Sequence, residues 1–210
     1  IAPCLAAGVP VVVKPATVTC YLTAVMVEEI ISSGLLPEGS IQLICGSVGD
    51  LLDHVCEQDV VTFTGSASTG QRLKSHPAIV ANSVPFNMEA DSLNCSILGA
   101  QAEPGTLEFD LYVKELAKEM TVKAGQKCTA IRRAIVPEKY VDAVSEALSV
   151  RLKNVILGDP SKEGVRMGPL VGSAQVSDVQ AQVERLRENG CEVLFGGRED
   201  FSVTGADKNK

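Results

Sequence analysis

The first 45 residues contain a strand, a helix and a second strand in close succession. Residues 9–13 are an apolar run rich in valine, residues 23–31 carry apolar side chains at helical spacing, and residues 41–45 are a second apolar run. A strand, a helix and a strand joined by short connections form a βαβ unit, with parallel strands and a right-handed crossover. This feature constrains the fold most, because a parallel sheet needs helices packed against its faces.

The same alternation continues to residue 88. We predict a short helix, a strand, a helix and a strand over residues 51–57, 60–64, 66–74 and 84–88. These elements predict the α/β class, with a doubly wound parallel-sheet dinucleotide-binding domain. Such a domain binds its ligand at the carboxyl ends of the strands. We assign residues 1–91 to the C-terminal part of this cofactor-binding domain.

The pattern changes after residue 91. A linker over residues 101–105 separates further predicted elements, which are strands over 95–98, 131–136 and 192–195 and helices over 109–123, 140–152 and 175–188. The first of these helices should bury Tyr112, Leu116 and Met120 on one face. These elements predict the N-terminal part of an α/β catalytic domain over residues 92–210. Residue 1 is not methionine and residues 202–210 show no periodicity, so we expect a chain truncated at both ends.

The composition argues against several classes of partner. Of the 210 residues 45% are hydrophobic and 21% charged, and the net charge is −7, as in many globular proteins. Nucleic acids and anionic membranes need clustered lysine and arginine, which this chain does not have. No apolar run reaches the roughly 20 residues that span a bilayer. The seven cysteines form no CxxC pair, so we expect no metal site, mostly buried thiols and a reducing cytoplasm.

Two segments of the first domain have the chemistry of a cofactor site. The turn Phe63-Thr64-Gly65-Ser66 joins a predicted strand to a predicted helix, where backbone N–H groups and the Ser66 hydroxyl can bind a pyrophosphate. An ordinary βα turn has the same composition. Lys14 follows the first strand, where it can bind ribose hydroxyls or a ribose phosphate, although a surface lysine explains it equally well.

Two further residues are candidates for catalysis. Cys128 lies in a loop close in sequence to Lys123 and Lys127, and nearby positive charge lowers a thiol pKa and favours the nucleophilic thiolate. The alternative is a buried structural cysteine. Glu89 ends an apolar strand, where partial desolvation raises a carboxyl pKa and suits a general base. Neither histidine has the sequence context of a Cys–His dyad.

Taken in order, these segments resemble the aldehyde dehydrogenase superfamily. The matching segments are Lys14-Pro15-Ala16, Gly46, Phe63-Thr64-Gly65-Ser66, Met88-Glu89 and Gly125-Gln126-Lys127-Cys128. The resemblance implies that Cys128 is the nucleophile and Glu89 the general base. It implies that the cofactor is bound by Lys14, Thr17, Gly46, Gly65, Ser66 and Thr69. Residues 86–94 and 124–133 are similar to one branch, the dehydrogenase domain of bifunctional ring-opening proteins of aerobic phenylacetate catabolism.

That branch implies a reaction and an assembly. A CoA-linked semialdehyde would be oxidised to its acid with NADP or NAD, through a thioester on Cys128, and the Cys128 N–H would hold the oxyanion. Thr17 stands where many members carry a glutamate that binds both ribose hydroxyls, so we expect NADP to be accepted or preferred. The resemblance also implies a homo-oligomer with a hydratase-like domain after this chain.

The resemblance places two functional residues outside residues 1–210. The oxyanion-hole asparagine is expected before Ile1 and a second cofactor-binding glutamate after Lys210, so we expect the chain alone to be a poor enzyme. Two alternatives to the dehydrogenase remain open at this point. One is a non-catalytic, truncated nucleotide-binding fragment, and the other is a cysteine-dependent hydrolase or acyl transferase that needs no nicotinamide.

Overall fold

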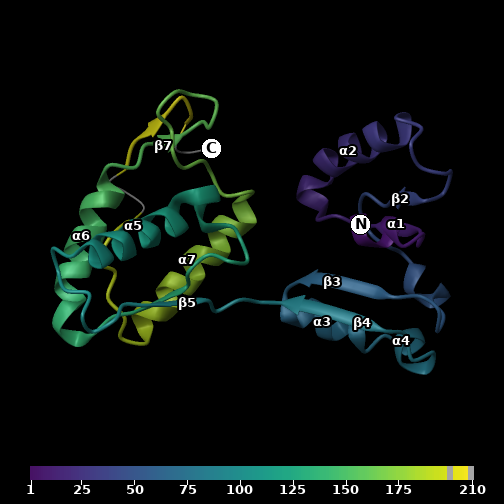
Figure 1. The fold of residues 1–210 in the computed structure, drawn as a ribbon, viewed down its shortest axis with the longest axis horizontal. Helices are drawn as coiled ribbons and strands as arrows, with labels where there is room; N and C mark the ends of the chain where they lie inside the picture. The colour runs from purple at the N-terminus through teal and green to yellow at the C-terminus, as the bar shows by residue number, and fades with distance from the viewer. Residues whose placement is uncertain (198–200, 208–210) are drawn as a thin grey trace. The chain divides into compact units, whose positions relative to one another are not determined.

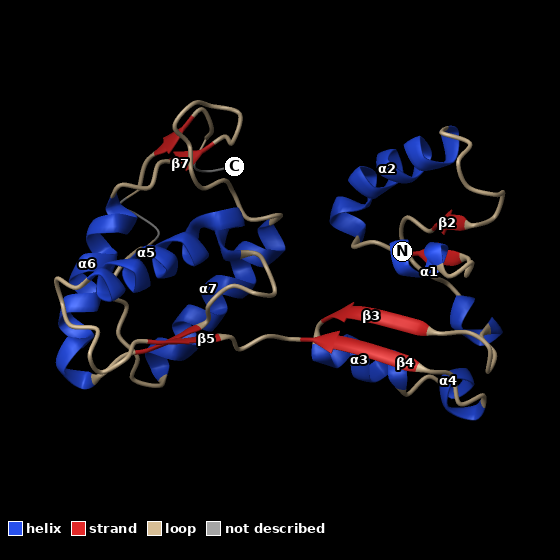
Figure 2. Ribbon diagram, viewed as in Figure 1, coloured by secondary structure: helices blue, strands red, loops and turns tan. Residues whose placement is uncertain are grey.

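The computed structural model describes residues 1–197 and 201–207, which fold into two compact units. Unit 1 is Ile1–Asp91 and unit 2 is Ser92–Lys210 (Figure 1). Helices and parallel strands alternate in both units, as the predicted α/β class requires (Figure 2). None of the helices in the described ranges is long and apolar enough to cross a bilayer.

The first half of unit 1 is the predicted βαβ unit. Its elements are α1 (Ala2–Ala6), β1 (Val11–Val13), the 3-10 turn η1 (Thr17–Thr19), α2 (Cys20–Ser32) and β2 (Ile41–Leu43). β1 and β2 are parallel, with Val11 opposite Ile41 and Val13 opposite Leu43. Ile41 and Val27 of α2 are both buried, which is consistent with the apolar face of the helix covering the strands.

The second half of unit 1 repeats the arrangement. Its elements are η2 (Leu51–His54), β3 (Val61–Gly65), α3 (Ala67–Lys74), α4 (Pro77–Ala81) and β4 (Phe86–Ala90). β3 and β4 are parallel and lie side by side in Figure 1. The sequence did not predict α4, which begins with Pro77 at a favourable first-turn position and is capped by the His76 ring, whose Nδ1 accepts a hydrogen bond from Ala78 N–H.

The strands of the first domain form two separate pairs in the described residues. β1 pairs only with β2 and β3 only with β4, so unit 1 contains two separate two-stranded sheets. A continuous sheet needs backbone hydrogen bonds between the two pairs, and periodicity within single strands carries no information about those bonds.

Unit 2 is built around two helices. Its elements are β5 (Cys95–Ile97), α5 (Leu107–Thr121), η3 (Val122–Gly125), β6 (Arg133–Ile135), η4 (Glu138–Tyr140), α6 (Val141–Lys153), β7 (Leu157–Gly158), α7 (Ser173–Glu188) and β8 (Val203–Thr204). The parallel pairs are β5 with β6 and β7 with β8. The buried core joins α5 to α6 and consists of Leu98, Phe109, Val113, Leu116, Tyr140 and Val144.

Three predictions for unit 2 need correction. Residues 192–195 are a loop and not a strand, since no strand of the described ranges bonds to them. Met120 is 46% exposed, because the buried face of α5 is formed by Phe109, Val113 and Leu116. β8 forms within the segment that shows no periodicity, because Thr204 accepts a hydrogen bond from Asp159 N–H at 2.9 Å. Residues 208–210 lie outside the described residues.

Candidate active site

Lys14 and Gly46 follow the ends of β1 and β2. The two strands are parallel and Ile44 N–H donates to the Val13 carbonyl at 2.9 Å, so both residues lie beyond the same sheet edge. Lys14 is exposed, and its ammonium group donates a long hydrogen bond of 3.5 Å to the Thr17 hydroxyl. Gly46 has a φ of +117°, which only glycine adopts readily. This edge offers a cation and a hydroxyl group to a ligand.

The turn between β3 and α3 places Gly65 and Ser66 at a helix N-terminus. Ser66 is the N-cap, and its hydroxyl oxygen accepts a hydrogen bond of 3.3 Å from Thr69 N–H. The Ser66 hydroxyl also donates to the Thr69 hydroxyl oxygen at 3.0 Å. A Cβ atom at Gly65 would lie 2.5 Å from the tip of the Phe63 ring, so any other residue here would force that ring to move. The first turn of α3 therefore presents hydroxyl and N–H groups as an anion site needs.

Asp91 also binds at this helix N-terminus, and sequence reasoning missed it. Its carboxylate accepts a hydrogen bond of 3.2 Å from Ala67 N–H, and its backbone has a φ of +52°. Asp91 N–H donates to the Gly65 carbonyl at 3.3 Å, which ties the two strand ends together. One N–H group expected to face a pyrophosphate is thus bonded to a carboxylate. The residue type was the only sequence signal, because Asp and Asn tolerate a positive φ better than most residues do.

Glu89 lies on β4 directly opposite Thr64, one residue before Gly65. Its side chain is exposed within unit 1, so the partial desolvation expected from the sequence is not provided by this unit. The strand alternates between half-buried and exposed residues, and Glu89 occupies an exposed position. The register brings Glu89 to the same sheet end as the Ser66 turn.

Cys128 is exposed in the described structure, whereas the alternative considered above was a buried structural cysteine. Exposure alone does not distinguish it, because Cys4, Cys45, Cys56, Cys95 and Cys191 are exposed as well, contrary to the expectation of mostly buried thiols. The loop before it is unusual: Lys123 and Ala124 both have a φ of +53°, and Gly125 has +71°. Non-glycine residues in this region cost about 1–3 kcal/mol each and persist only where other contacts hold them.

Asn94 and Ser92 hold the backbone on the C-terminal side of Cys128. The Asn94 amide donates to the Cys128 carbonyl at 2.6 Å and to the Ala130 carbonyl at 3.3 Å. The Ser92 hydroxyl donates to the same Cys128 carbonyl. Ala130 is fully buried, which anchors this side of the loop in the unit.

Gln126 ties the loop to a second segment of unit 2. Its amide nitrogen donates to the carbonyls of Lys123 at 3.0 Å and Pro169 at 3.3 Å. Its amide oxygen accepts from Val171 N–H at 2.8 Å. The side chain thus bridges backbone groups more than forty positions apart along the chain.

Lys127 forms a salt bridge with Glu119 of α5. The ammonium nitrogen lies 2.7 Å from a carboxylate oxygen, and the side chains are only 24% and 16% exposed. The sequence suggested that Lys127 supplies positive charge to Cys128. The structure corrects this, because Glu119 neutralises the Lys127 charge.

Arg132 holds the backbone on the N-terminal side of Cys128, and sequence reasoning did not identify it. Both terminal nitrogens of its guanidinium group donate to the Gly125 carbonyl at 3.1 Å, and Nη2 also donates to the Lys127 carbonyl at 3.0 Å. The neighbouring Arg133 binds the Leu93 carbonyl instead, at 2.6 and 3.2 Å. Two consecutive arginines are a weak signal, because the sequence does not specify which carbonyls they bind.

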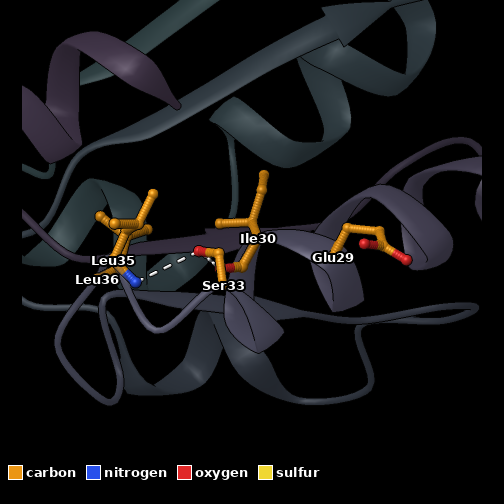
Figure 3. Close-up of a pocket in the computed structure, with 5 residues that line it drawn as sticks. All are labelled: Glu29, Ile30, Ser33, Leu35 and Leu36. Carbon is orange, nitrogen blue, oxygen red and sulfur yellow. Dashed lines mark hydrogen bonds between the residues drawn. The ribbon is translucent and has the colours of Figure 1, made fainter.

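The candidate residues are divided between the units. Unit 1 holds Glu89 and the six candidate cofactor-binding residues, and unit 2 holds Cys128. No group of three His, Cys, Asp or Glu residues within the described ranges is arranged to hold a metal ion. The hollow in Figure 3 lies at the end of α2 and contains none of the candidate residues; it is lined by Glu29, Ile30, Ser33, Leu35 and Leu36.

A family model matches almost the whole chain. Residues 1–208 match the aldehyde dehydrogenase family. A 3,4-dehydroadipyl-CoA semialdehyde dehydrogenase of Aromatoleum evansii is 53% identical over 206 residues, which are 98% of this chain and 40% of that protein. A putative aldehyde dehydrogenase of Staphylococcus haemolyticus is 31% identical over 204 residues, which are 94% of this chain and 40% of that protein.

Solved structures agree in fold. A betaine aldehyde dehydrogenase double mutant from Staphylococcus aureus, in complex with NAD+, superimposes with a TM-score of 0.84 at 29% identity, over 96% of this chain and 40% of that chain. The same enzyme in another NAD+ complex superimposes with a TM-score of 0.80 over 90% of this chain and 37% of that chain. This chain spans about 40% of the length of the curated relatives that it matches.

Proposed function

The chain belongs to the aldehyde dehydrogenase family, and on this premise we propose that it carries the nucleophile and general base of an enzyme that oxidises an aldehyde to a carboxylic acid. Unit 1 is then part of the cofactor-binding domain and unit 2 part of the catalytic domain. The proposal rests on the exposure of the Cys128 side chain and on the hydrogen bonds that hold its backbone. Its side chain is exposed, while hydrogen bonds fix the carbonyls on both sides of its Cα atom.

The chemistry of the proposed reaction assigns a role to each catalytic side chain. The Cys128 thiolate attacks the aldehyde carbon, so that a C–S bond forms and the carbonyl electron pair moves to oxygen. The Cys128 N–H donates a hydrogen bond to that oxyanion. After oxidation to the thioester, Glu89 removes a proton from the attacking water. The C–S bond then breaks, which releases the acid and restores the thiolate.

The residues at the two sheet ends fit a dinucleotide. Lys14 provides an exposed cation next to the Thr17 hydroxyl, and the first turn of α3 provides Ser66 with its N–H groups. The Asp91 carboxylate also binds at this turn. The bound nicotinamide supplies the two-electron oxidation by accepting a hydride. We propose NADP or NAD as the cofactor, with Lys14 binding the ribose and Ser66, Gly65 and Thr69 binding the pyrophosphate.

The proposed substrate is a CoA-linked semialdehyde. The relative that is 53% identical over nearly the whole chain is named a 3,4-dehydroadipyl-CoA semialdehyde dehydrogenase. From the resemblance of residues 86–94 and 124–133 to the ring-opening branch, we also propose that the reaction belongs to aromatic acid catabolism of the phenylacetate type. We also propose that the intact protein is a cytoplasmic homo-oligomer with a further hydratase-like domain.

The test measures NADPH or NADH formation by absorbance, with the intact protein and aldehyde substrates. Cys128→Ser should abolish cofactor reduction, while Cys191→Ser, which changes another exposed cysteine of unit 2, should retain it. Glu89→Gln should give a single-turnover burst followed by slow turnover, because the thioester forms but its hydrolysis is impaired. Ester or thioester hydrolysis without cofactor reduction would instead favour the hydrolase or acyl transferase. An inert protein would favour the non-catalytic alternative.

A further inference from the structure

The Arg132 guanidinium group is bound to the peptide that contains the N–H of the proposed nucleophile. Nη2 donates to the Lys127 carbonyl at 3.0 Å, and both terminal nitrogens donate to the Gly125 carbonyl. The backbone of Arg132 is itself anchored, because its N–H donates to the Asn94 carbonyl at 2.9 Å. A planar guanidinium group can bind two carbonyls at once in a fixed geometry, which an ammonium group does less well.

The Lys127 carbonyl and the Cys128 N–H belong to the same planar peptide. The chain has no cis peptide bond in its described part, so these two groups point in opposite directions. A hydrogen bond from Arg132 to the carbonyl therefore fixes the direction of the N–H. Within residues 1–197 and 201–207 the Cys128 N–H has no hydrogen-bond partner, which leaves it available to an external acceptor.

The backbone before Cys128 needs such a contact to keep its conformation. Lys123 and Ala124 both have a φ of +53°, a region that residues with side chains avoid. Without the bonds from Arg132, the Gly125 and Lys127 carbonyls lose their charge-assisted donors, and the 127–128 peptide is held only by the longer bond from Ala130 N–H to the Lys127 carbonyl, at 3.2 Å. The bonds from Asn94 act on the next peptide and do not replace them.

We propose that Arg132 is a positioning residue that directs the Cys128 N–H toward the oxyanion formed during attack on the aldehyde. The inference rests on the proposed function, because it takes Cys128 as the nucleophile. Arg132 itself contacts neither substrate nor cofactor in this assignment. Its effect is limited to steps in which negative charge develops on the substrate oxygen.

The test compares Arg132→Gln and Arg132→Lys with Arg151→Gln in the intact protein. Arg151 is an exposed arginine in the last turn of α6, outside the Cys128 loop, and serves as the matched control. The first readout is kcat for aldehyde oxidation. The second is the rate of Cys128 alkylation by iodoacetamide, which consumes the thiolate without forming an oxyanion.

Arg132→Gln should lower kcat by about tenfold to a hundredfold, somewhat less than the loss of a whole oxyanion donor. Its alkylation rate and its KM for NADP should stay within about twofold of wild type. Arg132→Lys should recover part of kcat, because one ammonium group can reach one carbonyl. A kcat within about twofold of wild type, or a parallel fall of kcat and alkylation, would overturn the proposal.

Failure of the proposed function gives a different result. In that case the wild-type protein is alkylated at Cys128 but reduces no cofactor with aldehydes. The loop contact is then tested by amide hydrogen exchange at Ala130, whose N–H donates to the Lys127 carbonyl at 3.2 Å. Faster exchange in Arg132→Gln but not in Arg151→Gln supports the positioning contact, and unchanged exchange contradicts it.

Discussion

The ammonium nitrogen of Lys127 lies 2.7 Å from a carboxylate oxygen of Glu119, and neither side chain is more than a quarter exposed. Glu119→Gln would leave the Lys127 charge without its partner in a mostly dry environment. We expect a loss of about 1–3 kcal/mol in the free energy of unfolding, measured by urea titration. The matched control is Glu115→Gln one turn earlier, which removes an exposed pair with Lys118 and should cost less than about 0.5 kcal/mol. Equal losses in the two variants would contradict the prediction that the less exposed salt bridge stabilises the protein more.

Asn94 should influence turnover through the Cys128 carbonyl. Asn94→Ala removes the donor to the Cys128 and Ala130 carbonyls, and we expect kcat for aldehyde oxidation to fall about tenfold. Asn94→Asp should be worse, because a carboxylate facing a carbonyl oxygen has no proton to donate. Asn154→Ala removes a similar bond to the Val150 carbonyl on α6 and should leave kcat within about twofold. A larger effect at Asn154 would show that the loss is not specific to the loop.

Ser66 should contribute both to the stability of α3 and to cofactor binding. Ser66→Ala removes the helix cap and should cost about 1 kcal/mol of unfolding free energy, whereas Ser66→Gly should cost only a few tenths. Both should raise the cofactor Kd about five- to tenfold, because both remove the hydroxyl. Fluorescence titration measures Kd. The control is Ser75→Ala at the other end of α3, and a Kd that follows stability instead of the hydroxyl would refute the assignment.

Thr17 should set the cofactor preference together with Lys14, whose ammonium group bonds to it. Thr17→Glu adds a negative charge that repels the 2′-phosphate of NADP but can accept bonds from the ribose hydroxyls of NAD. The ratio of kcat/KM for NADP to that for NAD should fall at least about tenfold. Val18→Glu places the same charge at the adjacent, 59% exposed position and should change the ratio less than about twofold. A strong NAD preference in the wild-type protein would refute the idea.

Asp159 should make stability depend on pH in acid. The Ser161 N–H donates to its carboxylate at 2.9 Å, which lowers the pKa of Asp159 below its ordinary value of 3.8. The carboxylate's contribution to stability is therefore complete above pH 3.8 and is lost as pH falls through the lowered pKa. Asp159→Asn should be less stable than wild type near neutral pH, and the difference should shrink below pH 3.8. Urea titrations across this pH range measure the difference in unfolding free energy between the two proteins. A difference that does not change with pH would contradict the prediction.

The positions of the elements in unit 1 follow well from the sequence. Local periodicity and turn residues specify a strand at β1, a helix at α2 and the cap at Ser66, because these depend on neighbours within a few positions. The pairing of strands is different, since a strand shows its burial pattern but not its partner. This is why the strand predicted over residues 192–195 was wrong, and why the two-residue β8 was missed.

The candidate site divides in the same way. The segments that contain Lys14, Ser66, Glu89 and Cys128 are recognisable in the sequence, and their order indicates the aldehyde dehydrogenase family that the comparisons show. Periodicity and local motifs gave no indication that Arg132 binds the Lys127 carbonyl. They also gave no indication that Glu119 neutralises Lys127, or that Asp91 binds the N-terminus of α3.

The sequence by itself determined the chemical groups of this protein and the elements that carry them, because residue type and local spacing act over a few positions. The tertiary structure alone decided which charges are neutralised and which backbone groups are held. Asn94 and Cys128, for example, are 34 positions apart and meet only because β5 and β6 pair in parallel. Contacts of this kind depend on how the elements pack, and packing is a property of the whole unit and not of any segment.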